Sequence, residues 1–415
     1  MKKYDLKSFL KSMRYFISVL FIKKEYDVIF IYENHFNRGK NGENLFLFPM
    51  IESCKKNNIK YIVFEDTDLK AAFSSFPRNK EAIPLDFISL LRIIYRKFYK
   101  NKNFIKGKNR YYFDREKNFA FLMKKTFFKN FKFQYCINMA GENLSLFRGL
   151  DKNAILSEYQ HGTIYNGHED YLINNRVDNY IYKNKANFLV FGKGFKELLI
   201  NQDKSGYYNE NNVIDIGINS SLITKKNNMQ KQQNIILFTS QLTTDLPQNT
   251  MKEYIKILKS LIDKNKLYFK KFNYKIIFKH HPRYNDKECP NIDLDKNLIE
   301  IVDSKETLDE LLDKVKIHMT FRSTTAFEAG LKGVPTIFIN MLDFFTKDDI
   351  FFEQYNYPLE DFKIIKTNQL GRILELIEEE NKYEEISKNV YSWAREFYQD
   401  FDEEKFLNLI KKATL

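Results

Sequence analysis

The stretch KIHMTFRSTTAFEAGLKGVPTIFI, residues 316–339, contains a complete strand–helix–strand pattern. Its two ends, Lys316–Thr320 and Pro335–Ile339, are short apolar runs of the kind found in buried parallel strands. Between them, the apolar residues of Thr325–Lys332 recur at three and four positions and predict a helix. Gly333 and Pro335 should end this helix and begin the next strand. Such a unit is the building block of a parallel-sheet α/β protein.

The same alternation occurs along most of the chain. The other expected strands are 26–32, 60–64, 133–138, 188–191, 234–238, 274–278 and 299–302. Further helices are expected at 250–264, 307–314, 383–398 and 403–412. Two Rossmann-like α/β halves are therefore predicted.

The 415 residues are enough for two domains. The segment KKNNMQKQQ, residues 225–233, is polar and has no apolar periodicity, so it is the expected linker. We predict an N-terminal domain at 1–228, a second domain at 229–390, and C-terminal helices at 391–415 that can pack back on the first domain.

The composition, with 43% hydrophobic residues, is typical of a globular protein, and the sparse cysteines favour a reducing cytoplasm. Cys54, Cys136 and Cys289 are far apart and show no metal-ligand spacing, which argues against a disulfide framework or a structural zinc site. The apolar run 16–22 is far shorter than the roughly 20 residues of a membrane span. Because Lys23, Lys24 and Glu25 follow it, it is also a poor signal peptide.

Three loops that follow expected strands contain residues suited to chemistry. The first is Lys279-His280-His281-Pro282-Arg283, directly after 274–278. Ligands of open α/β sheets bind beyond the carboxyl ends of the strands, so this cationic segment is placed to meet a phosphate. A histidine can donate a hydrogen bond to a phosphoryl oxygen, but it can also simply cap a strand.

The second loop, Thr320–Gly330, follows a strand and opens a helix. Ser323 or Thr324 can cap this helix, whose first amides and dipole favour an anion. Glu328 stands three residues after Thr325, so a purely structural capping box explains the pattern equally well.

The third loop contains Gln160-His161-Gly162-Thr163, after the apolar residues 154–156. Gly162 lets the backbone approach a ligand closely, and His161 can bind a phosphate or a sugar hydroxyl. His168 and Asp170 belong to the same loop. Solvated loop residues without a function remain the alternative.

The order of these motifs resembles that of GT-B glycosyltransferases of bacterial surface polysaccharides. It is most similar to the capsule-type group that uses CMP-activated acidic sugars, namely sialyltransferases, polysialyltransferases and Kdo transferases. The resemblance covers residues 155–340. It implies two Rossmann-like domains that face a central cleft, with a nucleotide sugar as donor, no cofactor, and a capsule or lipopolysaccharide glycan as acceptor.

The resemblance also implies site roles. Contacts with the donor phosphate fall to His281, Ser323 and Thr324, and a contact with the nucleotide ribose falls to Glu328. The full set of expected donor-binding residues is Ser240, Gln241, His280, His281, Pro282, Arg322, Ser323, Thr324, Thr325 and Glu328. The acceptor-side candidates are Gln160, Gly162, His168 and Asp170.

The general base is less clear, because the sialyltransferase-like families place an acidic pair before a glycine and this chain has none. An inverting transfer needs a carboxylate or histidine to take the acceptor proton. We favour Glu142, at the end of the expected strand 133–138, together with His161 as catalytic residues. Glu33, Glu158 and Asp170 remain alternatives, whereas Glu43 is better explained as a first-turn helix acid.

The chain has no carboxylate-rich metal signature; Asp66 and Asp68 form an isolated DxD that reads as a strand-end loop. We therefore expect a metal-independent transfer, in which positive groups and helix dipoles neutralise the leaving phosphate. The nearest alternative is a CDP-glycerol or CDP-ribitol phosphotransferase of the same fold. Those enzymes usually carry an Asp before the serine pair, where this chain has Phe321-Arg322. A nucleotide-sugar 2-epimerase shares the fold, but its acidic and histidine pattern is missing.

The net charge of +13 suggests an anionic partner. Within residues 92–132, 14 Lys and Arg face only Asp114 and Glu116, and aromatic residues are interleaved. This surface suits an acidic glycan or an anionic membrane, and no nucleic-acid module is visible. A non-catalytic polyanion-binding protein is the alternative of a different class. The apolar residues of 6–20 have helical spacing, so this segment either lies on the inner membrane or packs on the first domain.

Overall fold

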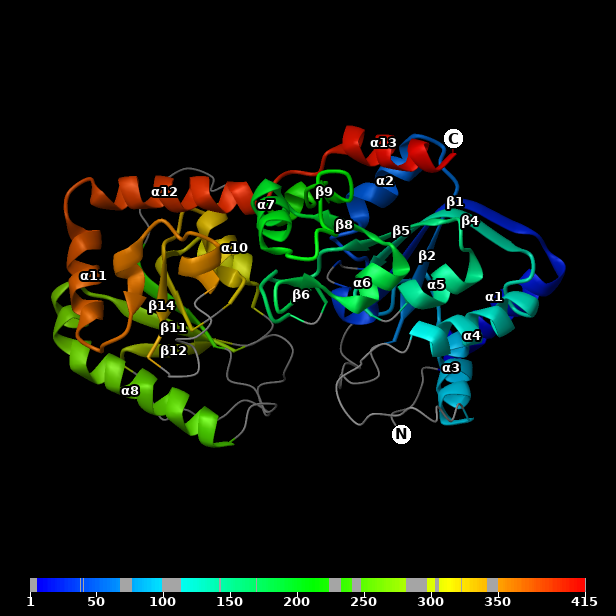
Figure 1. The fold of residues 1–415 in the computed structure, drawn as a ribbon. Helices are drawn as coiled ribbons and strands as arrows, with labels where there is room; N and C mark the ends of the chain where they lie inside the picture. Colours follow the sequence, from blue (N-terminus) through cyan, green and yellow to red (C-terminus); the bar gives the residue numbers. More distant parts are fainter. Residues whose placement is uncertain are drawn as a thin grey trace. The chain divides into compact units, whose positions relative to one another are not determined.

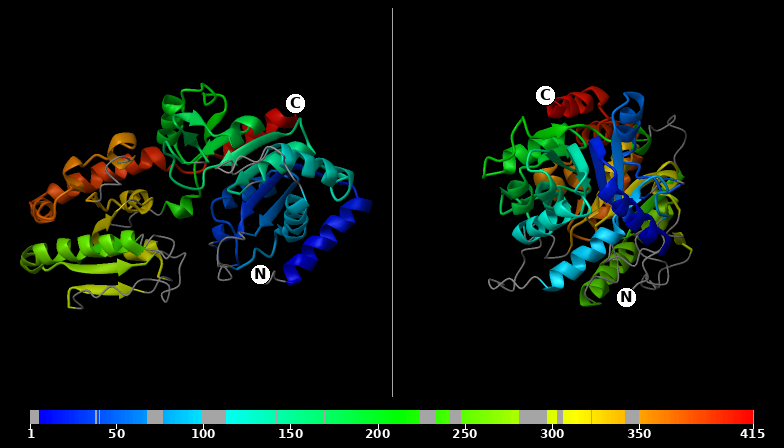
Figure 2. Two further views of the ribbon diagram at one scale, coloured as in Figure 1. Left: turned by 60° about the horizontal axis from the view of Figure 1, so that its bottom comes forward. Right: turned by 90° about the vertical axis from the view of Figure 1, so that its right-hand side faces the viewer.

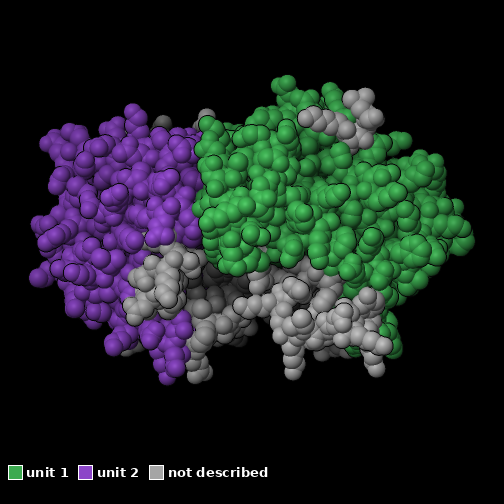
Figure 3. Space-filling model, in the orientation of Figure 1, with its two compact units in different colours: residues 1–222, 399–415 green, residues 223–398 purple. Residues whose placement is uncertain are grey.

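The computed structural model describes residues 6–37, 39, 41–67, 77–98, 113–141, 143–168, 170–223, 233–240, 248–280, 297–302, 306–321, 323–341 and 350–414 (Figure 1). The chain forms two compact units (Figure 3). Unit 1 comprises Met1–Leu222 and Gln399–Leu415, and unit 2 comprises Ile223–Tyr398. Apart from Gln233, the predicted linker at 225–233 lies outside the described residues.

Unit 1 is built on a parallel sheet, in which the described residues form seven strands in the order β3-β2-β1-β4-β5-β8-β9. Their bounds are β1 Lys24–Glu33, β2 Tyr61–Asp66, β3 Ile83–Pro84, β4 Phe131–Met139, β5 Ile155–Tyr159, β8 Asn187–Val190 and β9 Val213–Asp215. A small antiparallel pair, β6 Leu172–Ile173 and β7 Arg176–Val177, follows β5. The central strands β1 and β4 end in runs of fully buried residues, as expected for a sheet covered on both faces.

The helices of unit 1 are α1 Leu6–Phe21, α2 Phe48–Lys56, α3 Asp86–Phe98, α4 Phe113–Lys125, α5 Leu144–Leu150, α6 Asn179–Asn184, α7 Lys193–Gln202 and α13 Glu403–Thr414. Aromatic rings form much of the core, and Phe64 contacts the rings of Phe16, Phe131 and Phe147. The last helix, α13, lies beside α2 (Figure 1). There, Glu403 accepts a hydrogen bond from Ser53 Oγ at 3.0 Å.

Unit 2 contains a second parallel sheet, with six strands among its described residues in the order β12-β11-β10-β13-β14-β15. They are β10 Gln233–Thr239, β11 Lys275–Lys279, β12 Ile299–Val302, β13 Val315–Thr320, β14 Thr336–Ile339 and β15 Lys363–Ile364. Its helices are α8 Gln248–Lys271, α9 Leu308–Leu312, α10 Thr325–Leu331, α11 Gln369–Glu378 and α12 Lys382–Phe397.

Helix α10 is central to the packing of unit 2. The Phe327 ring stacks on Trp393 of α12, with 4.7 Å between the ring centroids. Gly333, with φ +68°, follows the helix in the left-handed conformation that glycine adopts readily, and the chain then enters β14. The expected strand–helix–strand unit at 316–339 is therefore present.

The predicted fold class is confirmed, because both units are parallel-sheet α/β domains. Expected strands such as 133–138 and 299–302 coincide with β4 and β12. The expected N-terminal helix is α1, and it packs on α3 of unit 1. Within the described ranges, no helix is both long enough and apolar enough to cross a membrane.

Candidate active site

In unit 1, the site is formed where β1, β4 and β5 end. These strands are parallel neighbours in the sheet, so the residues that follow them meet at one edge. Glu33 ends β1, Ala140 follows β4, and Gln160 follows β5. The third loop of the sequence analysis therefore lies next to the turn that contains Gly141.

Gln160 holds this loop in place from inside the protein. Its side chain is fully buried. The amide oxygen accepts a hydrogen bond from the Phe191 backbone N–H at 3.0 Å, and the amide nitrogen donates to the Gly162 carbonyl at 2.9 Å. Gln160 thus fixes the backbone on both sides of His161, and its predicted contact with an acceptor would have to be indirect.

His161 lies between two carboxylates. Its Nδ1 atom is 3.8 Å from Glu158 Oε1, and its Nε2 atom is 3.6 Å from Asp170 Oδ2. The backbone N–H of His161 donates to the Tyr171 hydroxyl at 3.3 Å. His168 completes the group, since its Nδ1 atom lies 3.8 Å from Asp170 Oδ2. The structure therefore brings together the predicted residues His161, His168 and Asp170 with the alternative Glu158.

Glu158 is the most deeply buried member of this group. Its carboxylate accepts hydrogen bonds from Asn138 Nδ2 at 2.7 Å and from the Ala140 backbone N–H at 3.0 Å. Burial raises the pKa of Glu158 well above its ordinary value, and the charges of Asp170 and Glu33 raise it further against these two hydrogen bonds. Burial thus disfavours the charged form of Glu158, the carboxyl group on the Nδ1 side of His161.

The turn after β4 has an unusual backbone. Ala140 and Gly141 both have positive φ, at +62° and +81°. A Cβ atom on Gly141 would lie 3.0 Å from Glu33 Oε1, so the turn and the end of β1 are in close contact. Glu142, our favoured base, lies outside the described residues. Its role stays a prediction, but both of its neighbours in the chain are held at this edge.

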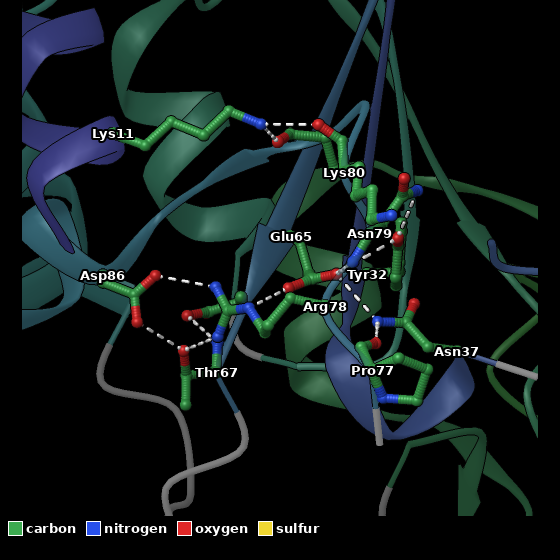
Figure 4. A network of polar contacts seen from close by, with 12 residues as sticks. Lys11, Tyr32, Asn37, Glu65, Thr67, Pro77, Arg78, Asn79, Lys80 and Asp86 are labelled. Atoms are coloured by element: carbon green, nitrogen blue, oxygen red, sulfur yellow. Dashed lines mark hydrogen bonds and ion pairs between the residues drawn. The ribbon is translucent and has the colours of Figure 1, made fainter. Parts of the chain in front are cut away.

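A second polar network lies at the end of β2 (Figure 4). Arg78 contacts the buried Glu65 and pairs with Asp86 at 2.7 Å. Glu65 also accepts hydrogen bonds from Asn37 Nδ2 at 2.8 Å and from the Asn79 backbone N–H at 2.9 Å. Burial raises the pKa of Glu65, and the charge of Arg78 opposes the rise. The network ties the turn after β1 to residues 77–79, and no sequence motif indicated it.

In unit 2, a buried histidine organises the edge where β10 and β13 end. His318 is in β13, and its ring is fully buried. Its Nδ1 atom lies 2.9 Å from Thr336 Oγ1, and its Nε2 atom lies 2.9 Å from Thr239 Oγ1 and 3.3 Å from Thr325 Oγ1. Burial lowers the pKa of His318 to about 3, so the ring is neutral.

Because His318 is neutral, one ring nitrogen accepts and the other donates, which sets the directions of the threonine hydroxyls. Thr239 and Thr325 also contact each other, at 3.1 Å between their hydroxyl oxygens. His318 was missed in the sequence, although it is a polar residue within an apolar strand. This pattern could have indicated a buried polar network.

The other predicted donor residues are placed as follows. Ser323 Oγ accepts a hydrogen bond from the Thr325 backbone N–H at 3.3 Å, whereas Thr324 occupies the N-cap position without a side-chain cap hydrogen bond. Glu328 is exposed on α10. Ser240 and His280 are buried directly after β10 and β11. Gln241, His281, Pro282 and Arg322 lie outside the described residues.

No group of three or more His, Cys, Asp or Glu side chains suited to a metal ion occurs in the part of the chain that the structure describes. The cluster around His161 can be considered for acid–base chemistry on its own features. Two features suit it to that role, namely a histidine near a carboxylate and a second carboxyl group whose pKa is raised by burial.

Comparisons of sequence found no match, either among protein-family models or among curated proteins. Comparisons of structure found similar proteins. The wall teichoic acid polymerase TagF, in its H444N variant, has a TM-score of 0.52 at 13% identity, over 99% of this chain and 98% of that chain. The same variant soaked with CDPG for 30 minutes has a TM-score of 0.50, again at 13% identity and over the same shares of the two chains.

A putative UDP-N-acetylglucosamine 2-epimerase from Listeria monocytogenes is also similar. Its TM-score is 0.50 at 12% identity, over 95% of this chain and 97% of that chain. At such low identity, these similarities show the fold alone. The chain therefore has the GT-B fold, with two parallel-sheet α/β domains.

Proposed function

We propose that the protein is an inverting glycosyltransferase that transfers an acidic sugar from a CMP-activated donor to a bacterial capsule or lipopolysaccharide glycan. The GT-B fold supports a nucleotide-dependent transferase. The order of the QHG, HP and Ser/Thr motifs along the chain supports the CMP-sugar group. Unit 1 would bind the acceptor and unit 2 the donor.

The observation that carries the proposal is the placement of His161 between Glu158 and Asp170. The Nδ1 atom of His161 is buried. Nε2 lies 3.6 Å from Oδ2 of the partly exposed Asp170, and we propose that this nitrogen meets the acceptor hydroxyl. A carboxylate beside the ring would stabilise the protonated imidazole, which suits His161 to act as a general base.

In the proposed step, the acceptor oxygen forms a bond to the anomeric carbon of the donor sugar. The bond between that carbon and the phosphate oxygen breaks, and CMP leaves with the bonding electron pair. The acceptor proton passes to Nε2 of His161, and the Asp170 carboxylate stabilises the imidazolium. Because the attack is a single displacement from the face opposite the leaving group, the configuration inverts. Glu142 remains the second candidate for this proton.

On the donor side, we propose that the hydroxyls of Ser323 and Thr324, with Thr325 beside them, bind the phosphate. They lie at the carboxyl edge of the unit 2 sheet, where the His318 network holds Thr325. The roles of His281, Pro282, Arg322 and Gln241 rest on the motifs alone. Glu328 is exposed on α10, and its contact with a ribose hydroxyl also rests on the motif alone. We also propose that no metal ion is needed, which predicts full activity in the presence of a chelator.

The test is CMP release from CMP-activated acidic sugars in the presence of a capsule or lipopolysaccharide glycan. We expect His161→Ala to lower the rate while CMP binding is kept, and added imidazole to restore part of the rate. Imidazole rescue would not occur if His161 were only structural. If His161→Ala is fully active and Glu142→Gln is inactive, Glu142 is the base instead. No turnover of any CMP-sugar would contradict the proposed donor.

A second candidate function is polyol-phosphate transfer from CDP-glycerol or CDP-ribitol. This reaction class shares the HP motif and the GT-B fold, and two TagF structures of that fold were soaked with CDPG. In that reaction, the acceptor oxygen attacks phosphorus rather than carbon, and CMP again leaves. Release of CMP from CDP-glycerol, and not from CMP-sugars, would select this alternative.

A further inference from the structure

Helices α1, α3 and α4 of unit 1 expose an unusual amount of apolar surface. Of the 14 large hydrophobic side chains that are exposed in the described part of the chain, eight lie in these helices or directly after α1. The most exposed are Phe98, at 81%, and Phe21, at 80%. Scattered exposed apolar residues are ordinary, but such a concentration usually marks an interaction site.

The three helices form one continuous layer (Figures 1 and 2). The Phe9 and Phe87 rings join α1 to α3, and the Tyr95 and Phe119 rings join α3 to α4. Asn130, in the segment after α4, donates a hydrogen bond from Nδ2 to the Leu20 carbonyl near the end of α1 at 2.9 Å. The exposed end of α1 therefore lies next to the segment that follows α4.

The exposed charge of this layer is almost entirely positive. Along the described residues of α1, α3 and α4, Asp114 is the one exposed acidic side chain. Six exposed cationic side chains accompany it, namely Lys7, Arg14, Lys97, Lys117, Lys124 and Lys125. The Lys125 ammonium lies 4.2 Å from the centroid of the exposed Phe121 ring, so basic and apolar groups alternate on the same face of α4.

Below this surface, a buried cluster adds to the positive charge. Glu116 contacts three arginines, with Arg92 Nε at 2.6 Å, Arg96 Nη2 at 2.8 Å and Arg115 Nε at 3.2 Å. Burial opposes ionisation of Glu116, but Arg92 and Arg96 outweigh it and hold its pKa below its ordinary value. Three guanidinium groups thus gather around one buried carboxylate beneath the helical layer.

We propose that this face binds the surface of an anionic lipid bilayer, with the apolar side chains inserted between headgroups and the lysines in contact with lipid phosphates. We call it the basic–apolar patch and define it as Phe21, Phe121, Leu122, Lys124 and Lys125. A bilayer surface is the occupant that matches both properties, because interfacial helices combine an apolar face with Lys and Arg. The proposal is independent of the proposed catalytic activity.

The test is flotation of the full chain with vesicles of phosphatidylcholine alone or mixed with phosphatidylglycerol. We expect binding to the anionic vesicles that weakens as salt is raised. Each lysine near an anionic surface contributes about 1 kcal/mol, so Lys124→Gln with Lys125→Gln should lower the partition coefficient about 30-fold. Phe121→Ser with Leu122→Ser should lower binding to the same vesicles without changing thermal unfolding, since both side chains are exposed.

The matched control lies on α8 of unit 2, where Leu267 is 81% exposed and Lys270 is exposed. Leu267→Ser with Lys270→Gln should leave vesicle binding unchanged. An equal loss in this control would show general adhesion and overturn the proposal. Equal binding to neutral and anionic vesicles would also overturn the proposal. The same holds if the protein binds an oligonucleotide but not vesicles. A dimer in sedimentation that Phe121→Ser dissociates, without vesicle binding, would identify the patch as a contact between copies.

Discussion

The buried histidine of unit 2 leads to a quantitative prediction about pH and stability. His318 is fully buried, and its pKa is lowered to about 3. In the unfolded chain, a histidine titrates near 6.5. As the pH falls below about 6.5, the unfolded chain therefore takes up a proton that the native state excludes, so the free energy of unfolding decreases. The slope is about 1.4 kcal/mol per pH unit, which amounts to about 2 kcal/mol between pH 7 and pH 5.

The perturbation is His318→Asn, which removes the titrating group. The protein has a single tryptophan, Trp393, and it is buried in unit 2 against Phe327. Its fluorescence during urea unfolding therefore reports on unit 2. We expect the variant to be less stable at pH 7, because polar partners such as Thr239 lose their contacts. The difference in unfolding free energy between wild type and variant should shrink by about 2 kcal/mol at pH 5.

If the free energy of unfolding changed with pH in the same way for wild type and His318→Asn, this reasoning would be refuted. Such a result would mean that His318 titrates alike in the native and unfolded states. The control is His35→Asn in unit 1. Because Trp393 reports on unit 2, this change should leave the pH dependence of the tryptophan transition as in the wild type.

Three further outcomes are expected. His161→Ala should lower kcat for CMP release by about 100-fold or more, as for loss of a general base, with CMP affinity unchanged in calorimetry. Glu158 holds its proton in the native state at pH values where the unfolded chain has lost it, so wild-type stability falls as the pH rises above about 4.3. Glu158→Gln should remove this loss, and the gap between the two proteins should widen with pH in urea unfolding followed by circular dichroism. Thr325→Val should lower the free energy of unfolding of unit 2 by about 1 kcal/mol for each lost hydrogen bond, and Thr324→Val should lower it less. Trp393 fluorescence during urea unfolding measures both variants.

The fold could be predicted from the sequence because its signal is local. The apolar run at Lys316–Thr320, the helical spacing of Thr325–Leu331 and the stop at Gly333 each depend on neighbouring residues. A parallel sheet buried on both faces also needs continuous apolar strands, which are easy to recognise. Strands of two residues, such as β3 and β15, carry too few residues to show a pattern and were not predicted.

The candidate site could be predicted only in part. The rule that ligands bind beyond strand ends selected His161 and Asp170. It did not show that Asp170 would lie 3.6 Å from His161 Nε2, because this contact depends on how the loop folds over Tyr171. Gln160 has a polar side chain suited to a ligand, yet it is buried and hydrogen-bonded to the backbone of Gly162 and Phe191.

The least predictable features are those made by distant residues. Arg78 joins Glu65 to Asp86, and nothing in the local sequence distinguishes it from a surface arginine. Similarly, the sequence suggested C-terminal helices that pack back on the first domain, but it did not indicate that Glu403 of α13 meets Ser53 of α2. Such contacts are decided by packing across hundreds of residues rather than by periodicity.

The central claim is that the protein uses a cytidine-activated donor, and nucleotide binding to the full chain tests it most directly. Isothermal titration calorimetry with CMP, CDP, UDP and GDP should show measurable binding of CMP that is stronger than that of UDP or GDP. A preference for CDP would favour polyol-phosphate transfer. A clear preference for UDP or GDP, or no binding of any of the four nucleotides, would contradict the account.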